Sequence, residues 1–195
     1  MDQSETELAA LLADDLYQHY GQLVLRYQHL LYSFALRLTG SRQDAEDIVQ
    51  EAFLRAYASL LHFSVPRLRT LKLRPWLYKI TLNTFRQYTR TPQFQALPLG
   101  LSEQSPALEL PEAELAQPEI LYEAKEQQAE LEQLVASLPA RYRVAIACYY
   151  FEQMSYSEIA ELLDQPLGTV KSTVSRGTKV LRETQKSQHT ERRAF

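Results

Sequence analysis

The chain has 195 residues, of which 45% are hydrophobic and 23% are charged, and its formal net charge at pH 7 is −3. This apolar content is sufficient for a packed core, and the length fits one domain or two small ones, so disordered and fibrous classes are excluded. Only five glycines occur, and no segment combines strand alternation with turn dipeptides, which predicts an all-α fold.

Cysteine use and the first residues bear on the cellular compartment. Cys148 is the only cysteine, and because it lies in an apolar run we interpret it as a core residue in a reducing environment. The N-terminus is acidic, unlike a signal peptide, and no apolar stretch approaches the ~20 residues of a membrane span. We therefore expect a cytoplasmic protein without membrane insertion.

Charges are segregated along the chain. Residues 52–102 contain eight Lys or Arg and no acid, residues 103–132 contain nine Glu and one Lys, and residues 165–195 contain seven Lys or Arg and two Glu. Blocks of this kind indicate separate surfaces with separate partners, even though the average charge is slightly negative.

The first dozen residues are predicted to be a frayed helix or a loose lead-in. Residues 15–38 have apolar side chains at helical spacing, which predicts one helix or two, with a break near Gly21. Gly40 fits a helix C-terminus, and Ser41 followed by Asp44 predicts the start of the next helix.

That next helix carries an unusual polar side. Acids in its first turn, Asp44 and Asp47, favour the positive end of the helix dipole and need no partner. Gln50, Glu51 and the outward-facing Leu54 have no such explanation. We therefore interpret this side as a contact patch for a basic partner.

A basic loop, residues 62–74, precedes a helix predicted from Pro75 to Arg90. On a helical wheel Leu77, Ile80, Thr84 and Tyr88 face inward, whereas Lys79, Asn83, Arg86 and Arg90 share the opposite face. Trp76 and Tyr78 lie near it in the sequence. Cations interleaved with aromatic side chains suit unpaired nucleic-acid bases, which stack on the rings.

Residues 92–120 contain scattered Pro and Glu without a helical repeat and are predicted to be a flexible linker. Two helices split at Pro139 should follow, and the residues from Thr184 onward should form a disordered polar tail.

Between these lies a predicted helix-turn-helix. Ser155 and Glu158 form a capping box that starts its first helix, and the Asp-Gln-Pro run at 164–166 ends that helix. In the second helix Val170, Val174, Gly177 and Leu181 form a buried stripe. The opposite side carries Lys171, Ser172, Ser175, Arg176 and Lys179, a composition that a DNA major groove accepts. A surface helix with merely solvated charges is the alternative.

Three segments together resemble the extracytoplasmic-function (ECF) group of bacterial RNA polymerase sigma factors: residues 44–57, 75–90 and 138–182. The resemblance implies an all-α protein of two small helical domains. Sigma domain two would span 15–91 and sigma domain four 121–183, with the linker at 92–120 and the tail at 184–195.

The resemblance also implies partners and site residues. Core RNA polymerase would be bound by Asp47, Gln50, Glu51 and Leu54. The melted minus-ten promoter element would be bound by Arg74, Trp76, Tyr78, Lys79, Asn83, Arg86 and Arg90, with Asn83 at the position that contacts a flipped-out base. The minus-thirty-five duplex would be read by Lys171, Ser172, Ser175, Arg176 and Lys179. Members of this group are usually held inactive by an anti-sigma protein, which is therefore a further implied partner.

Some residues depart from the family pattern. Thr173 and Thr178 stand where the family often has arginine. Gly177 replaces a usual alanine, which costs the helix about 1 kcal/mol of stability. These departures bear on promoter sequence preference.

Other classes of function remain as alternatives. A dimeric helix-turn-helix regulator would need no polymerase, and a helical adaptor would bind protein alone. A hydrolase or metal enzyme is not favoured, because the four histidines are scattered and no phosphate-binding glycine loop occurs. We predict no catalytic residue, no metal and no cofactor.

Overall fold

The structure, a computed structural model, describes residues 3–90, 131–132 and 134–192. Within these ranges all regular structure is helical, as the sequence predicts. The elements are α1 (Gln3–Asp14), α2 (Leu16–Thr39), α3 (Arg42–Leu60), α4 (Val65–Arg69), α5 (Leu73–Tyr88), α8 (Ala140–Ile146), the π-helical η1 (Ala147–Phe151), α9 (Tyr156–Leu163) and α10 (Leu167–Arg192). The predicted linker, residues 92–120, lies outside the described residues.

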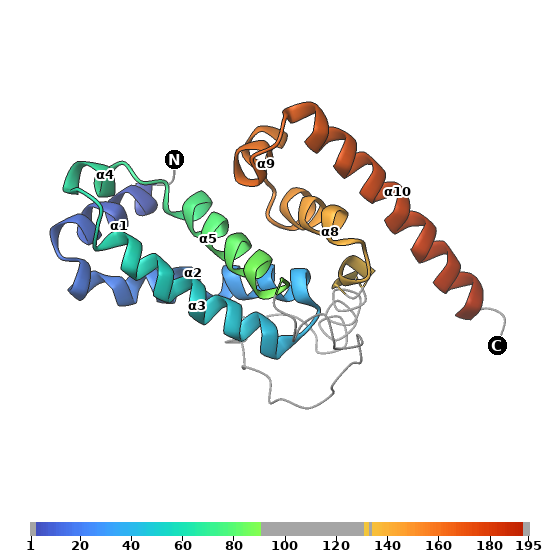
Figure 1. Cartoon of the computed structure of the whole chain (residues 1–195), viewed down its shortest axis with the longest axis horizontal. Helices are drawn as coiled ribbons and strands as arrows, with labels where there is room; N and C mark the ends of the chain where they lie inside the picture. Colours follow the sequence, from blue (N-terminus) through green and yellow to red (C-terminus); the bar gives the residue numbers. More distant parts are fainter. Residues whose placement is uncertain (1–2, 91–130, 133, 193–195) are drawn as a thin grey trace, which may run out of the picture.

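The N-terminal unit, α1–α5, is a bundle in which α2, α3 and α5 lie alongside one another, with α1 and α4 at one end (Figure 1). Its core is apolar and fully buried, including Leu31, Phe34, Ile48 and Leu77. The helix boundaries follow from local capping. Gly40 ends α2 in the left-handed conformation with φ 72°, and the Ser41 side chain accepts a hydrogen bond from the Asp44 N–H at the start of α3.

The first helices differ from the prediction in two respects. Of the two alternatives for the first dozen residues the helix is observed, but it is packed rather than frayed, because α1 buries Leu8, Ala9 and Leu12 against the bundle. Nor is there a break at Gly21, which lies inside the continuous α2. A glycine costs a helix interior only about 1 kcal/mol, and burial of the apolar stripe of α2 outweighs that cost.

The C-terminal unit, α8 to α10, contains the helix-turn-helix. The predicted capping box is present, with the Ser155 N–H donating to Glu158 Oε2 at 2.8 Å and the Glu158 N–H donating to Ser155 Oγ at 3.3 Å. Asp164 ends α9 in the left-handed conformation with φ 56°. The predicted disordered tail is not observed up to Arg192, because α10 continues as one helix to that residue.

Gly177 has a packing role that the sequence did not reveal. It is buried, and a Cβ atom there would lie 3.0 Å from Ile146 Cγ1 and 3.2 Å from Tyr142 Cβ, both on α8. The missing side chain therefore allows α10 to approach α8 closely.

We expect Gly177→Ala to destabilise the protein by about 1 kcal/mol, because overpacking at about 1–3 kcal/mol outweighs the gain in helix propensity. Gly168→Ala is the matched control in the same helix, since nothing lies within 4 Å of its Cβ position, and it should be neutral or stabilising. Urea unfolding followed by circular dichroism measures both. Equal stabilisation by the two substitutions would show that α8 can move away from the added methyl group without a loss of stability.

The two units pack against each other. The segments α8 and η1 contact α2, α9 contacts α5, and buried apolar side chains of both units form a continuous core. None of the helices in the described ranges is both long enough and apolar enough to cross a membrane.

Candidate nucleic-acid interface

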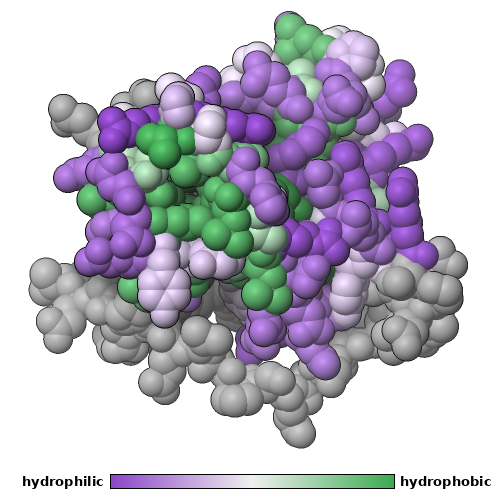
Figure 2. Space-filling view, turned by 60° about the vertical axis from the view of Figure 1, so that its left-hand side comes forward, coloured by the Kyte–Doolittle hydropathy of each residue, from purple (hydrophilic) through white to green (hydrophobic). Residues whose placement is uncertain are grey.

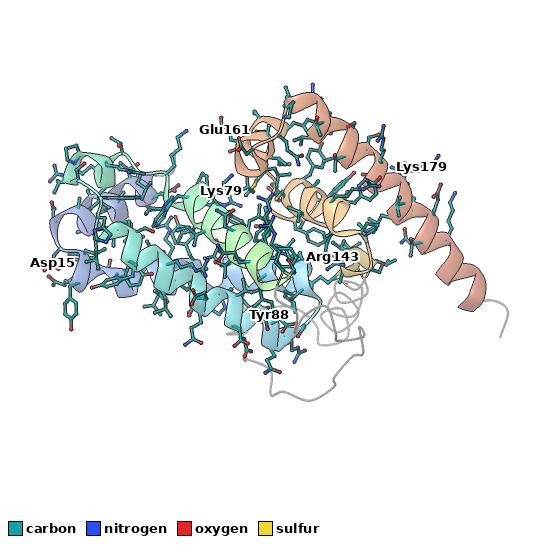
Figure 3. All side chains as sticks on the ribbon, viewed as in Figure 1. Asp15, Lys79, Tyr88, Arg143, Glu161 and Lys179 are labelled. Carbon is teal, nitrogen blue, oxygen red and sulfur yellow. The ribbon has the colours of Figure 1, made fainter. Side chains whose placement is uncertain are left out.

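The outer side of α10 is polar and accessible. All five predicted residues are exposed, and we refer to Lys171, Ser172, Ser175, Arg176 and Lys179 as the α10 basic face. Val170 and Val174 anchor the opposite side, with exposed fractions of 0% and 2%. In Figure 3 Lys179 lies on the side of α10 away from the N-terminal unit. The face is therefore free to enter a major groove.

The start of α10 is supported by an aromatic cluster. The rings of Tyr149 and Tyr156 stack with centroids 4.8 Å apart, and Lys171 Nζ lies 6.0 Å from the Tyr156 ring centroid. Tyr150 is half exposed, and its hydroxyl lies 3.2 Å from Thr178 Oγ1. Thr178 also donates to the Val174 carbonyl, so it is held by its own helix and by η1.

A second candidate surface lies on α3. Asp47, Gln50, Glu51 and Leu54, which we call the α3 ridge, fall within about 100° of one another around the helix. Leu54 is 62% exposed, whereas Glu51 is held by Arg55 in an ion pair of 2.6 Å. The predicted outward orientation of these residues is confirmed.

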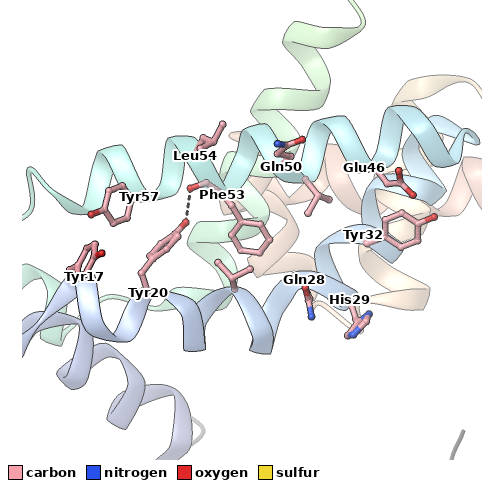
Figure 4. Close-up of a pocket in the computed structure, with 12 residues that line it drawn as sticks. Tyr17, Tyr20, Gln28, His29, Tyr32, Glu46, Gln50, Phe53, Leu54 and Tyr57 are labelled. Carbon is pink, nitrogen blue, oxygen red and sulfur yellow. Dashed lines mark hydrogen bonds between the residues drawn. The ribbon is translucent and has the colours of Figure 1, made fainter. Parts of the chain in front are cut away.

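The α3 ridge borders a groove between α2 and α3 that encloses 710 Å³ (Figure 4). Gln50 and Leu54 line it from α3, and Tyr17, Tyr20 and Tyr32 line it from α2. The Tyr20 hydroxyl donates to the Phe53 carbonyl at 2.5 Å, and burial raises the pKa of this phenol. Figure 2 shows apolar side chains gathered in one part of a largely hydrophilic surface, and Tyr17 and Leu25 are among the most exposed.

The third surface is on α5. Lys79, Asn83, Arg86 and Arg90 lie within about 60° of one another around the helix axis, and we call them the α5 basic face. Asn83 and Arg90 are exposed, and Lys79 and Arg86 are partly buried. Trp76 lies near this face and packs on Phe63, with ring centroids 5.8 Å apart. Its ring is partly accessible.

Two predicted members of this surface lie elsewhere. Tyr78 is fully buried, with its ring in edge contact with Phe34 at a centroid distance of 4.9 Å, so its ring is a core side chain in this structure. Arg74 is exposed but projects from the same side of the helix as Tyr78, about 120° or more away from the α5 basic face. The structure therefore separates Arg74 and Tyr78 from Asn83.

Tyr78 and Arg74 meet a carboxylate that sequence reasoning missed. Glu152, at the end of η1, is 4% exposed and accepts hydrogen bonds from the Tyr78 hydroxyl and, at 3.0 Å, from Arg37 Nη1. Arg74 Nη2 donates to the Glu152 carbonyl at 3.0 Å and lies 3.9 Å from its carboxylate. Burial, and then the Glu152 charge, raise the pKa of Tyr78, which therefore stays protonated and donates.

Arg37 is the second residue that sequence reasoning missed. Its guanidinium carbon lies 4.4 Å from the centre of the Phe151 ring, and Nη2 lies 3.4 Å from Glu132. Its Nε is buried and has no hydrogen-bond partner in the described part of the chain. The charge of Arg37 is thus largely removed from water and compensated mainly by the carboxylates of Glu132 and Glu152.

Each unit also places a cation at a helix C-terminus of the other. Lys79 Nζ donates to the Leu162 carbonyl at the end of α9, at 2.6 Å, and Arg143 Nη1 donates to the Leu38 carbonyl near the end of α2, at 2.5 Å. These carbonyls carry the negative end of the helix dipole. Figure 3 shows Lys79 where α5 faces α9. Burial lowers the pKa of Arg143.

The chain matches two known sequence families. Residues 23–93 match Sigma-70 region 2, and residues 128–181 match Sigma-70 region 4. Over 171 residues it is 32% identical to the ECF RNA polymerase sigma factor SigW of Bacillus subtilis, covering 84% of this chain and 87% of that protein. Over 169 residues it is 33% identical to the ECF RNA polymerase sigma-E factor of Escherichia coli, covering 83% and 84%.

Solved structures share the fold. CnrH in complex with the cytosolic domain of CnrY has a TM-score of 0.65 and 22% identity, with 95% of this chain and 99% of that chain covered. The sigma factor RpoE, in complex with the anti-sigma factor NepR from Bartonella quintana, has a TM-score of 0.59 and 26% identity, with 86% and 96% covered.

Proposed function

Because the chain belongs to the ECF group of RNA polymerase sigma factors, we propose that it binds core polymerase through the α3 ridge and selects promoters through α5 and α10. It acts as a dissociable specificity subunit in the cytoplasm, where core polymerase works, and it performs no chemical step of its own. The domain boundaries proposed for these roles are 15–91 and 121–183. An anti-sigma protein is a proposed further partner.

The observation that carries this proposal is the joint exposure of three distinct surfaces on helices that otherwise bury their apolar sides. The α10 basic face offers cations and small hydroxyls to a duplex. The α5 basic face offers cations, an amide and a nearby indole to an unpaired strand. The α3 ridge offers acids beside an apolar groove. A dimeric regulator would need only the first of these.

In the proposed role of α5, different residues bind the DNA backbone and recognise a base. Lys79, Arg86 and Arg90 would hold strand phosphates, and Asn83 would contact a base, because an amide can both donate to and accept from a base edge. Trp76 would supply a stacking surface. Stacking and phosphate contacts would offset the few kcal/mol needed to unpair a base.

The function is tested by in vitro transcription from a genomic library, using core polymerase with and without the purified chain, and by mapping the RNA start sites. New start sites that share two upstream elements are the expected result. If the chain produced no new start site and did not co-elute with core polymerase, the proposed function would be wrong.

Replacing Lys179 with alanine should weaken duplex binding about equally for all sequences. A lysine that neutralises one phosphate contributes about 0.9 to the slope of log K against log salt concentration, so the slope should fall by that amount. Lys179 is 79% exposed and only loosely paired with Glu183 at 4.0 Å, so folding should be unaffected. Fluorescence anisotropy with a duplex containing a mapped upstream element, measured across a salt series, gives the slope.

Arg42→Ala is the control for this measurement, because Arg42 is exposed on α3 in the other unit and carries the same charge. If Lys179→Ala had the same salt slope as the wild type and the control, Lys179 would not contact a phosphate of the duplex.

A further inference from the structure

We propose that α1 positions the strand-binding surface of α5. Two carboxylates near the ends of α1, Glu5 and Asp14, hold the first turn of α5 and the residues that lead into it. The match to Sigma-70 region 2 begins at residue 23, so α1 lies outside the matched residues. The positioning role rests on the proposed strand binding by α5, whereas the anchoring by α1 rests only on contacts within the N-terminal unit.

The first support is the cap that Glu5 provides for α5. Lys72, at the N-cap of α5, makes no side-chain capping hydrogen bond, and the first turn of the helix contains no acid. The N–H of Arg74 in that turn donates instead to Glu5 Oε1, at 2.8 Å and 69 residues away in the sequence. A carboxylate at this place satisfies a donor that the helix cannot pair itself, and it faces the positive end of the helix dipole. Glu5 therefore fixes the start of α5 from a different helix.

The second support is the contact between α1 and the short helix α4. Leu8, Leu12 and Leu68 are buried in the same core, and α1 lies against α4 (Figure 1). Asp14 Oδ1 accepts a hydrogen bond at 2.8 Å from Nη2 of Arg69, the last residue of α4. This ion pair is more than half exposed and is worth little alone, so the apolar packing supplies most of the attachment. The segment that joins α4 to α5 is thus held on α1 at both of its ends.

The third support is an aromatic stack that spans the two anchored helices. The guanidinium carbon of Arg67, on α4, lies 3.7 Å from the centre of the Phe63 ring. Phe63 in turn packs on Trp76 of α5 with ring centroids 5.8 Å apart, and both rings are partly exposed. Because α1 holds both α4 and the first turn of α5, it sets how the Trp76 ring is presented. A ring that is already held in place binds a base at a lower ordering cost than a mobile one.

The anchoring can be measured without DNA, because Trp76 is the only tryptophan of the chain and its fluorescence reports on the stack. Glu5→Ala removes the acceptor and should increase the quenching of Trp76 fluorescence by acrylamide. Glu5→Gln keeps a side-chain oxygen that can accept from the Arg74 N–H, so it should restore quenching to near the wild-type level. Glu7→Ala, at an exposed acid of the same helix, should leave quenching unchanged.

A fourth variant controls for a general loss of stability. Ser41→Ala removes a cap of the same kind from α3, where the Ser41 side chain accepts from the Asp44 N–H at 3.3 Å. Loss of either cap should lower the free energy of unfolding by a similar amount. Only Glu5→Ala should make Trp76 more accessible to acrylamide in the folded protein.

Strand capture is measured with holoenzyme and a labelled single-stranded oligonucleotide that carries a mapped minus-ten element. Fluorescence anisotropy should show about fivefold weaker binding for Glu5→Ala, a factor that corresponds to about 1 kcal/mol, the usual value of a helix cap. The other three variants should bind the strand as the wild type does. Binding of an upstream-element duplex should be the same for all four, because α10 lies in the other unit.

The two measurements separate the anchoring from its consequence. Quenching in Glu5→Ala equal to that in Glu7→Ala or Ser41→Ala would overturn the anchoring. Increased quenching with wild-type strand affinity would overturn the positioning role. If the wild-type holoenzyme did not bind the strand, the proposed role of α5 would fail, while the quenching result would still decide whether Glu5 anchors Trp76.

Discussion

Asn83→Ala should reduce the yield of open promoter complexes by about tenfold or more, without changing duplex binding by α10. A side chain that reads one base is worth about 1–3 kcal/mol, and each 1.4 kcal/mol corresponds to a factor of ten. Asn83 is exposed on α5, so its truncation leaves the core intact. Permanganate footprinting of thymines in the melted region, with reconstituted holoenzyme, measures the yield directly.

Gln43→Ala is the matched control, since it removes a similar exposed amide from α3, a helix that does not carry the α5 basic face. It should leave opening unchanged. The loss in Asn83→Ala should also vary with the base at one promoter position, which a general loss of affinity would not do. Equal opening by the two variants at every promoter would exclude Asn83 from base capture.

Local features of this fold were predictable because they depend on residues that are close together in the sequence. The capping box of Ser155 and Glu158 and the buried stripe containing Val170 and Val174 were predicted from spacing and are confirmed. The exposed positions of Asn83 and Leu54 followed from helical wheels in the same way. In each case the residues that determine the feature lie within a few turns of one another in the same helix.

What could not be predicted depends on residues far apart in the sequence. Residues 52–102 contain no acid, yet Glu152 meets Arg74 from 78 residues away in the sequence. The family resemblance implied that Tyr78 lies on the strand-binding surface, but Phe34 and Glu152 fix it in the interior. The only sequence signal for Glu152 is a charge placed directly after an apolar run.

Leu54→Asp should weaken binding to core polymerase by at least about thirtyfold, because apolar anchors at the centre of an interface are worth about 2 kcal/mol or more. Leu54 is 62% exposed in the free chain and borders the 710 Å³ groove between α2 and α3, which contains several tyrosines. A carboxylate introduced there would lose the apolar contact of Leu54 and would have to be desolvated against the apolar groups of the groove on docking. Co-elution with core polymerase on size exclusion at moderate salt is the measurement.

Two controls separate loss of docking from loss of folding or a general effect of charge. Leu54→Met preserves apolar volume and should bind nearly as well as the wild type. Val65→Asp adds the same charge at an exposed apolar residue of α4, away from the α3 ridge, and should bind normally. Because Leu54 is mostly exposed, the aspartate should alter the free energy of unfolding by only about 0.5 kcal/mol. If Leu54→Asp bound core polymerase as tightly as Leu54→Met, the α3 ridge would not be the polymerase contact, and the apolar groove beside it would need another occupant.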